Sequence, residues 1–200
     1  MVGNLEPATA DFLARLVRLN PDALVRLRDG EIWGLVPWKV LVARTGVVSV
    51  GILTVRASAW LDQGGDPALL ERQDVRWRNR VPVEPPTVRE TMPTGVVRRL
   101  GQAAEETLRT TAEHGIHGRA VGSRKLRDAL LDHVPIVVTT DEGEWRVPQR
   151  LVQAVLRAGL LVDDDESEVR VVSSGEWTGL DTDAGFAWWH PTAFPPTLRR

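Results

Sequence analysis

One stretch of the sequence decides the kind of fold: ALVRLRDGEIWGLV, residues 23–36. At its centre stands Asp29-Gly30, a preferred pair for a two-residue hairpin turn, because both positions of that turn need a positive φ. The flanking residues 23–28 and 31–36 are the expected strands. Neighbouring strands joined by so short a turn pair antiparallel, which argues against a parallel sheet wound with crossover helices.

The pattern on either side of this hairpin supports the same class of fold. Upstream, Phe12, Leu13, Leu16 and Val17 share one helical face, and Asn20-Pro21 ends that helix. Downstream, the valine-rich residues 40–55 indicate one or two further strands. The second half predicts helices near residues 97–111, 123–134 and 148–158, and strands at 135–140, 169–173, 176–180 and 186–189. We therefore expect an α+β fold with helices packed on small antiparallel sheets.

A cluster of prolines divides the chain. Four of the thirteen prolines fall within residues 82–93, a spacing that disfavours a regular element. This predicts an N-terminal α+β domain over residues 1–81, a proline-rich linker over 82–94 and a C-terminal α+β domain over 95–200. The alternative is one domain with a long proline-rich crossover.

Composition excludes several classes of function. The 200 residues include no cysteine, which removes disulfides, thiolate catalysis and cysteine-ligated metal sites. The net charge of −2 gives no strong overall attraction to nucleic acid or to an acidic membrane. The longest apolar run, residues 47–55, is too short to span a bilayer, and the first residues lack the pattern of a secretory leader. We expect a cytoplasmic protein without a membrane partner.

Several segments of the sequence have a similar general residue pattern: residues 12–16 through 27–28, 36–37 with 40–42, and 147–148 through 159–161. In these segments the chain resembles hypothetical proteins of GC-rich actinobacteria. The resemblance implies a cytoplasmic bacterial protein and brings no activity, cofactor or site residue with it. The chain is also arginine-rich and tryptophan-rich, with 8 tryptophans.

The most suggestive stretch for function is VRWRNRV, residues 75–81. As a strand it places Arg76, Arg78 and Arg80 on one face and Trp77 on the other, because side chains alternate. We interpret Trp77 as an aromatic anchor and the three arginines as a charged clamp for a protein partner. The bland alternative is a solvated face paired with nearby acidic residues. The leading hypothesis is a non-catalytic binding or regulatory protein that acts through protein–protein contacts.

A second hypothesis is DNA binding by a winged-helix-like C-terminal half. The helix near residues 148–158 carries a polar face and precedes a hairpin, and glutamine and arginine can pair with bases. Two observations argue against it: the acidic run at residues 163–168 repels phosphate, and a strand separates the two helices. The candidate contacts are Arg124, Lys125, Gln149, Arg150, Gln153 and Arg157.

A third hypothesis is a metal-dependent enzyme that uses His114 and His117. Gly115 between them should break the helix, so the pair need not share a face. No third ligand follows at a typical spacing, and the sequence contains no zinc-protease, nucleophile-elbow or dinucleotide-binding motif. The sequence therefore indicates no catalytic residue, no cofactor and no metal site, and it favours a non-enzymatic role.

Overall fold

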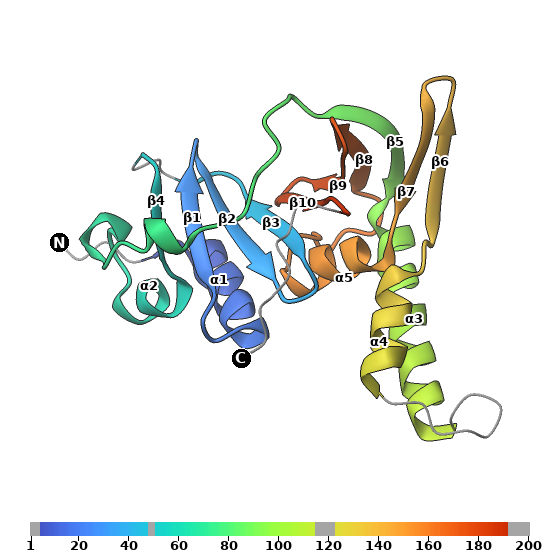
Figure 1. Cartoon of the computed structure of the whole chain (residues 1–200), viewed down its shortest axis with the longest axis horizontal. Helices are drawn as coiled ribbons and strands as arrows, with labels where there is room; N and C mark the ends of the chain where they lie inside the picture. The colour runs from blue at the N-terminus through green and yellow to red at the C-terminus, as the bar shows by residue number, and fades with distance from the viewer. Residues whose placement is uncertain (1–4, 48–50, 115–122, 192–200) are drawn as a thin grey trace.

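The computed structural model describes residues 5–47, 51–114 and 123–191, with the side chains of residues 112–114 and 123–125 left out (Figure 1). The helices are α1 (Pro7–Leu19), α2 (Ala57–Gln63), α3 (Thr94–His114), α4 (Ser123–Asp132) and α5 (Gln149–Arg157). The strands are β1 (Leu24–Arg28), β2 (Glu31–Val36), β3 (Val40–Arg44), β4 (Leu53–Arg56), β5 (Thr87–Pro93), β6 (Ile136–Thr140), β7 (Gly143–Val147), β8 (Glu168–Ser174), β9 (Trp177–Thr182) and β10 (Gly185–Trp189). Two 3₁₀ turns, Pro67–Leu69 and Asp74–Arg76, lie between α2 and β5.

Eight of these strands form one antiparallel sheet in the order β4-β1-β2-β3-β10-β9-β8-β5, and β6 pairs with β7 in a separate hairpin. Pairing of β3 with β10 joins the strands of the first half to those of the second, with Phe186 opposite Ala43. The α+β class is confirmed, and the sheet is larger than the small sheets expected. Strands from both halves belong to this one continuous sheet, and the division into two domains stays a prediction.

The hairpin at Asp29-Gly30 is confirmed. Arg28 pairs with Glu31 across the turn, so the loop contains only the two residues between them. Asp29 has φ 53° and Gly30 has φ 81°. Both values are those that a type I′ turn requires, and they explain why this dipeptide fixes the register of β1 against β2.

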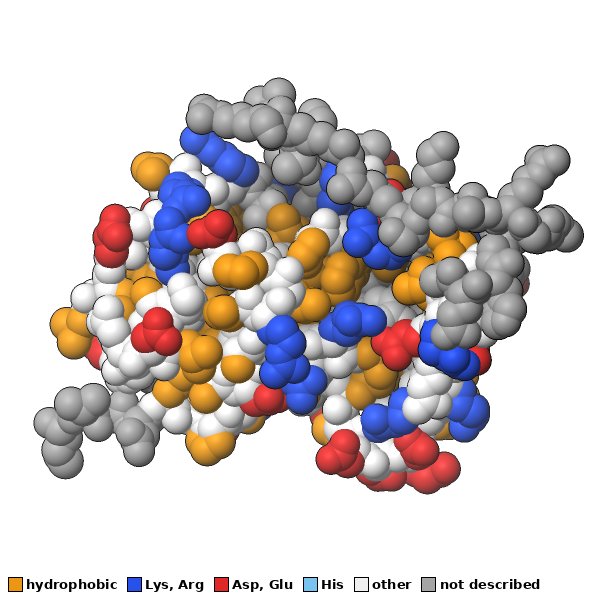
Figure 2. All heavy atoms as spheres, turned by 90° about the horizontal axis from the view of Figure 1, so that it is seen from below, with side chains coloured by type: hydrophobic (Ala, Val, Ile, Leu, Met, Phe, Trp, Pro, Cys, Tyr) orange, Lys and Arg blue, Asp and Glu red, His pale blue; other side chains and the backbone are white. Residues whose placement is uncertain are grey.

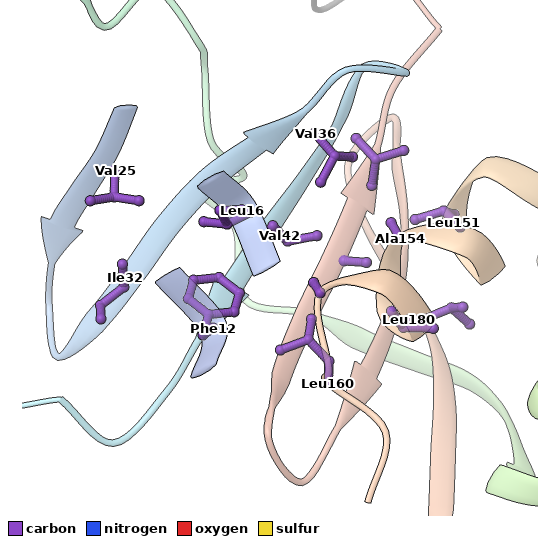
Figure 3. Packing of buried hydrophobic residues seen from close by; sticks show 14 of the residues in the cluster. Phe12, Leu16, Val25, Ile32, Val36, Val42, Leu151, Ala154, Leu160 and Leu180 are labelled. Carbon is purple, nitrogen blue, oxygen red and sulfur yellow. The ribbon is translucent and has the colours of Figure 1, made fainter. Parts of the chain in front are cut away.

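The main core lies between one face of the sheet and the helices α1 and α5 (Figure 3). Phe12 and Leu16 of α1 lie over the strands that carry Ile32 and Val42, and the side chains of α5 cover the strands of the second half. Gly34 on β2 permits the close approach of α1, because a Cβ there would lie 2.7 Å from a methyl carbon of Leu16.

The opposite face of the sheet carries a second, aromatic-rich cluster. Its buried members are Trp33, Leu41, Ala43, Trp77, Val172 and Trp188. Residues 64–86, here the crossing segment, run over this face from the β4 edge toward β5 (Figure 1). At one end Gln73 N donates to the Thr54 carbonyl oxygen over 2.7 Å. At the other, Ser174 Oγ donates to the Glu84 carbonyl oxygen over 2.9 Å.

The expectation that residues 82–94 contain no regular element is wrong in part, because β5 occupies Thr87–Pro93. β5 lies at the edge of the sheet and pairs only with β8 among the described strands. An edge strand tolerates proline, since its outward N–H groups need no ladder partner. Pro82, Pro85 and Pro86 precede the strand, and Pro93 is its last residue.

Candidate functional site

The stretch that was expected to form a strand, residues 75–81, does not form one. Asp74–Arg76 make a 3₁₀ turn, and the following residues are irregular. Asp74 holds this turn to the sheet edge, where its Oδ1 accepts the backbone N–H of Thr54 over 2.8 Å. The chain then crosses the sheet face rather than lying along an edge. No strand is therefore available to pair with it, and the alternation of its side chains does not set a strand face.

Trp77 is not an exposed anchor. Its side chain belongs to the aromatic-rich cluster and is only 8% exposed. Its indole Nε1 donates to the Asn79 carbonyl oxygen over 2.9 Å, and the guanidinium of Arg26 lies 6.0 Å from the ring centre. Trp77 thus fixes the crossing segment to the sheet, so the predicted anchor role is wrong.

The three arginines around Trp77 are exposed. Arg76, Arg78 and Arg80 lie on the outer side of the crossing segment. Val75 and Val83, 78% and 83% exposed, lie on the same segment. No acidic residue occurs between these valines. The result is a cationic and apolar outer surface on a segment held at both ends, and a partner contact through Arg76, Arg78 and Arg80 stays a prediction.

The neighbours of Asp74, the carboxylate that holds this segment to the sheet edge, shift its pKa. The Arg72 guanidinium donates to Asp74 over 2.7 Å and, together with the Thr54 N–H, holds the pKa of Asp74 below its usual range. At the hairpin, burial raises the pKa of Glu31. As the pH falls, the contributions of these two carboxyl groups to the stability of the fold therefore change in opposite directions.

The polar face of α5 binds other parts of this chain, so the interpretation as a winged-helix reader is wrong. Gln149 and Gln153 are 2% and 7% exposed, and their amide groups donate to the carbonyl oxygens of Leu100 and Gly101 on α3. Arg157 pairs with Glu105 at 3.0 Å. The strand that follows α5, β8, is part of the large sheet and forms no wing.

The remaining candidates belong to the DNA-binding hypothesis and to the hypothesis of a metal-dependent enzyme. Arg150 donates to the Trp38 carbonyl oxygen and pairs with Asp132, so it is also engaged within the chain. The side chains of Arg124 and Lys125 lie outside the described residues, as do the His114 side chain and the whole of His117. Among the residues that the structure does describe, no group of three or more His, Cys, Asp or Glu could hold a metal ion. In the same part of the chain, no helix is long and apolar enough to cross a membrane.

Sequence reasoning missed a cavity of about 410 Å³ on the helical side of the molecule. It lies between α3, α4, α5 and the turn from β2 to β3. Figure 2 views this side and shows apolar side chains at its centre with basic ones beside them. The apolar lining consists of Leu19, Pro37, Trp38, Ala104, Leu108, Leu130 and Leu131. The signal in the sequence is the pair Gln149 and Gln153, one helical turn apart beside apolar residues, a pattern that equally suits a base-reading face.

A second cavity of about 330 Å³ adjoins the first and shares Leu19, Glu105 and Arg157 with it. Its lining is strongly basic, with Arg15, Arg18, Arg98 and Arg157. Three of these arginines form ion pairs: Arg15 with Asp11, Arg98 with Asp165, and Arg157 with Glu105. Arg18 has no ion-pair partner among the described residues, so the field of this cavity is positive but partly neutralised.

Two solved structures show the fold that this chain shares. A DNA polymerase sliding clamp from Pseudomonas aeruginosa, crystallised with ligand, is 13% identical with a TM-score of 0.54, and the match covers 96% of this chain and 66% of the clamp. The Helicobacter pylori beta clamp in complex with carprofen is 11% identical with a TM-score of 0.50, covering 96% and 64%. The chain thus spans slightly less than two thirds of either clamp. At this identity the likeness shows the fold alone.

Sequence comparison finds a family match over part of the chain. No curated protein matches this chain. Residues 82–193 match the family described as "Domain of unknown function (DUF8185)", and this range includes β5, the helices α3 to α5 and all strands that follow. Since the match covers more than half of the 200 residues, the chain belongs to the DUF8185 family.

Proposed function

We propose that this protein is a non-catalytic protein-binding module and that the crossing segment is the surface that meets its partner. The observation that carries the proposal is the combination of Arg76, Arg78 and Arg80 with Val75 and Val83, all exposed on a segment anchored by buried Trp77. Arginine is enriched where protein surfaces bind one another, because its planar guanidinium makes several directed hydrogen bonds.

The crossing segment is held in place by contacts with the sheet, which distinguishes its surface from that of a free charged loop. Trp77 fills the cluster on the sheet, and the hydrogen bonds at Thr54 and Ser174 hold the two ends. A segment that is already ordered loses less conformational entropy when it binds. The partner that fits is an acidic protein segment with aliphatic side chains, which would pair with the guanidiniums and cover the valines. The fold shared with a sliding clamp of DNA polymerase supports a role in contacting other proteins.

The test is a binding titration with fluorescein-labelled ten-residue peptides, followed by anisotropy. One set alternates Asp or Glu with Leu or Val, and matched sets replace the acids by Lys or Ser. We expect the acidic set to bind the wild-type protein best. Replacing Arg76, Arg78 and Arg80 together by alanine should weaken this binding at least tenfold, whereas Arg146→Ala on the β6–β7 hairpin should not. Equal binding by both variants would contradict the proposal.

Nucleic acid is the second candidate partner. Four arginines line the 330 Å³ cavity on the helical side, and Arg18 lacks an ion-pair partner among the described residues. Binding to mixed-sequence duplex DNA should weaken steeply with salt, since cations that neutralise phosphates release counterions. The Arg18→Glu variant should lower that affinity. Salt-independent binding, or none at low salt, excludes this candidate.

A further inference from the structure

The 410 Å³ cavity on the helical side has the dimensions and lining of a site for a small molecule. Clefts that hold such ligands are commonly about 300–1,000 Å³, mostly apolar, with a few polar groups that fix orientation. Here the apolar lining comes from four separate parts of the fold: the end of α1, the β2–β3 turn, α3 and α4. Trp38 contributes the aromatic part of that lining.

The walls of the cavity are held at fixed spacing. Trp38 is tied to α5 by its indole Nε1, which donates to the Arg150 carbonyl oxygen over 2.9 Å. α3 and α5 meet closely at Gly101, where an added Cβ would collide with Leu156 of α5. These contacts set the distance between the helices, so the space between them does not depend on a ligand to keep it open.

Two neutral polar side chains line the cavity, the carboxamides of Gln149 and Gln153. The amide nitrogen of Gln149 donates to the Leu100 carbonyl oxygen over 3.4 Å, and that of Gln153 donates to Gly101 over 3.3 Å. The side-chain oxygen of Gln153 accepts from Arg157 Nε over 3.1 Å. The side-chain oxygen of Gln149 accepts no hydrogen bond from the described residues, although this side chain is only 2% exposed. Gln149 lines the cavity, so its side-chain oxygen is an acceptor that no described protein group occupies and that a ligand donor can use.

The charges at the cavity neutralise each other. Arg157 pairs with Glu105 at 3.0 Å, and Arg127 lies 3.7 Å from Asp128. No unpaired charge therefore faces the apolar lining from these four residues. A charged ligand would lose its hydration without gaining a counter-ion, whereas a neutral one loses little.

We propose that this cavity binds a small, neutral, mainly apolar molecule that donates one hydrogen bond to the side-chain oxygen of Gln149. The site is on the side of the sheet opposite the crossing segment, so it is independent of the proposed protein-binding surface. Ligand selection rests on the unpaired Gln149 oxygen beside the apolar part of the lining, because an analogue without the donor leaves that acceptor unpaired.

The probe pair is indole and 1-methylindole, which share an aromatic body but differ in the N–H donor. Binding to the ¹⁵N-labelled full-length protein is followed by the side-chain amide resonances of Gln149 and Gln153, and by saturation-transfer difference on the ligand. We expect saturable binding of indole, at least fivefold tighter than that of 1-methylindole, with the largest shifts at Gln149.

Three variants sharpen the test. Ala104→Phe fills the cavity and should abolish binding of both probes, whereas Ala103→Phe, one residue away on the exposed side of α3, should leave binding unchanged. Gln149→Met keeps the length of the side chain and removes the acceptor, and it should abolish the preference for indole. Equal affinity for the two probes, unchanged binding in Ala104→Phe, or no saturable binding of indole would each overturn the proposal. The wild-type comparison of the two probes still decides it if Gln149→Met fails to fold.

Discussion

Trp38 and Arg150 each bind the backbone of the other residue. The Trp38 indole Nε1 donates to the Arg150 carbonyl oxygen over 2.9 Å, and Arg150 Nη1 donates to the Trp38 carbonyl oxygen over 3.0 Å. Arg150 also pairs with Asp132 on α4, and its guanidinium lies 5.8 Å from the Trp189 ring centre. One side chain thus connects the β2–β3 turn to α4, α5 and the last strand.

Removal of this connection should destabilise the whole fold. Arg150→Ala is expected to lower the free energy of unfolding by about 2 kcal/mol, since hydrogen bonds to a charged group contribute about 1.5–3 kcal/mol. The side chain is only 15% exposed, so solvent screens it little. Urea denaturation measures the change. Arg146→Ala, at an exposed hairpin position, should stay within about 0.5 kcal/mol of wild type, and an equal loss in both variants would refute this assignment.

Trp77 and Arg78 should separate structural from binding roles. Trp77→Ala removes a buried indole from the sheet cluster and should cost about 3–5 kcal/mol of stability. Arg78→Ala removes an exposed side chain. It should leave the thermal midpoint of unfolding nearly unchanged and should weaken binding of the acidic peptide. Differential scanning calorimetry and anisotropy measure the two effects. A large loss of stability in Arg78→Ala would mean that this arginine is structural.

Gly179 on β9 should not tolerate a side chain. A Cβ there would lie 2.6 Å from the Trp188 ring and 2.9 Å from the Ala187 carbonyl oxygen. Trp188 is 3% exposed and has little room to move, so Gly179→Ala is expected to destabilise the protein by about 1–3 kcal/mol through overpacking. Thr178→Ala on the same strand is the control. Near-ultraviolet circular dichroism should also change in the first variant, because the environment of Trp188 changes.

Acid should weaken the attachment of the crossing segment. The pKa of Asp74 is lowered, first by the hydrogen bond from Arg72, so its carboxylate stabilises the fold above the ordinary pKa of 3.8. That contribution is lost as the pH falls through the lowered pKa. Asp74→Asn should therefore be less stable than wild type at neutral pH, and the difference should shrink below pH 3.8. Urea unfolding across this range tests it, with Asp62→Asn as a control carboxyl.

Glu31 should show the opposite dependence. Burial raises the pKa of its carboxyl group, so the protonated form is favoured by folding and ionisation lowers stability as the pH rises. Glu31→Gln is expected to stabilise the protein at neutral pH and to have little effect in acid. The same urea series measures this, and a loss of stability at neutral pH would contradict the sign.

Local chemistry explains which parts of the fold the sequence could predict. Asp29-Gly30 fixes a turn through its own backbone preferences, and Phe12 with Leu16 marks a helical face, so both follow from neighbouring residues. Residues 75–81 could not be assigned in this way. Their alternation resembles a strand, but Trp77 docks on a sheet face built from strands in both halves of the chain.

The cavity at Gln149 and Gln153 is harder to predict from sequence, because polar side chains ordinarily face water. Gln149 and Gln153 lie on the polar side of a helix, yet both are buried because carbonyl oxygens of α3 accept their amide protons. The close crossing at Gly101 that brings α3 so near is a long-range contact. Periodicity within α5 carries no information about a partner helix fifty residues upstream.

The place of β10 in the sheet has a consequence for biosynthesis. β10 is the last of the described strands, yet it lies near the middle of the sheet, between β3 and β9. During translation the outer edge of β3 emerges early and finds its neighbour only when residues 185–189 leave the ribosome. Until then the nascent chain presents an open, valine-rich strand edge, the kind of template that recruits other extended chains. The sheet is therefore completed only after β10 has been synthesised, and the interval before that is one in which a chaperone would be of use.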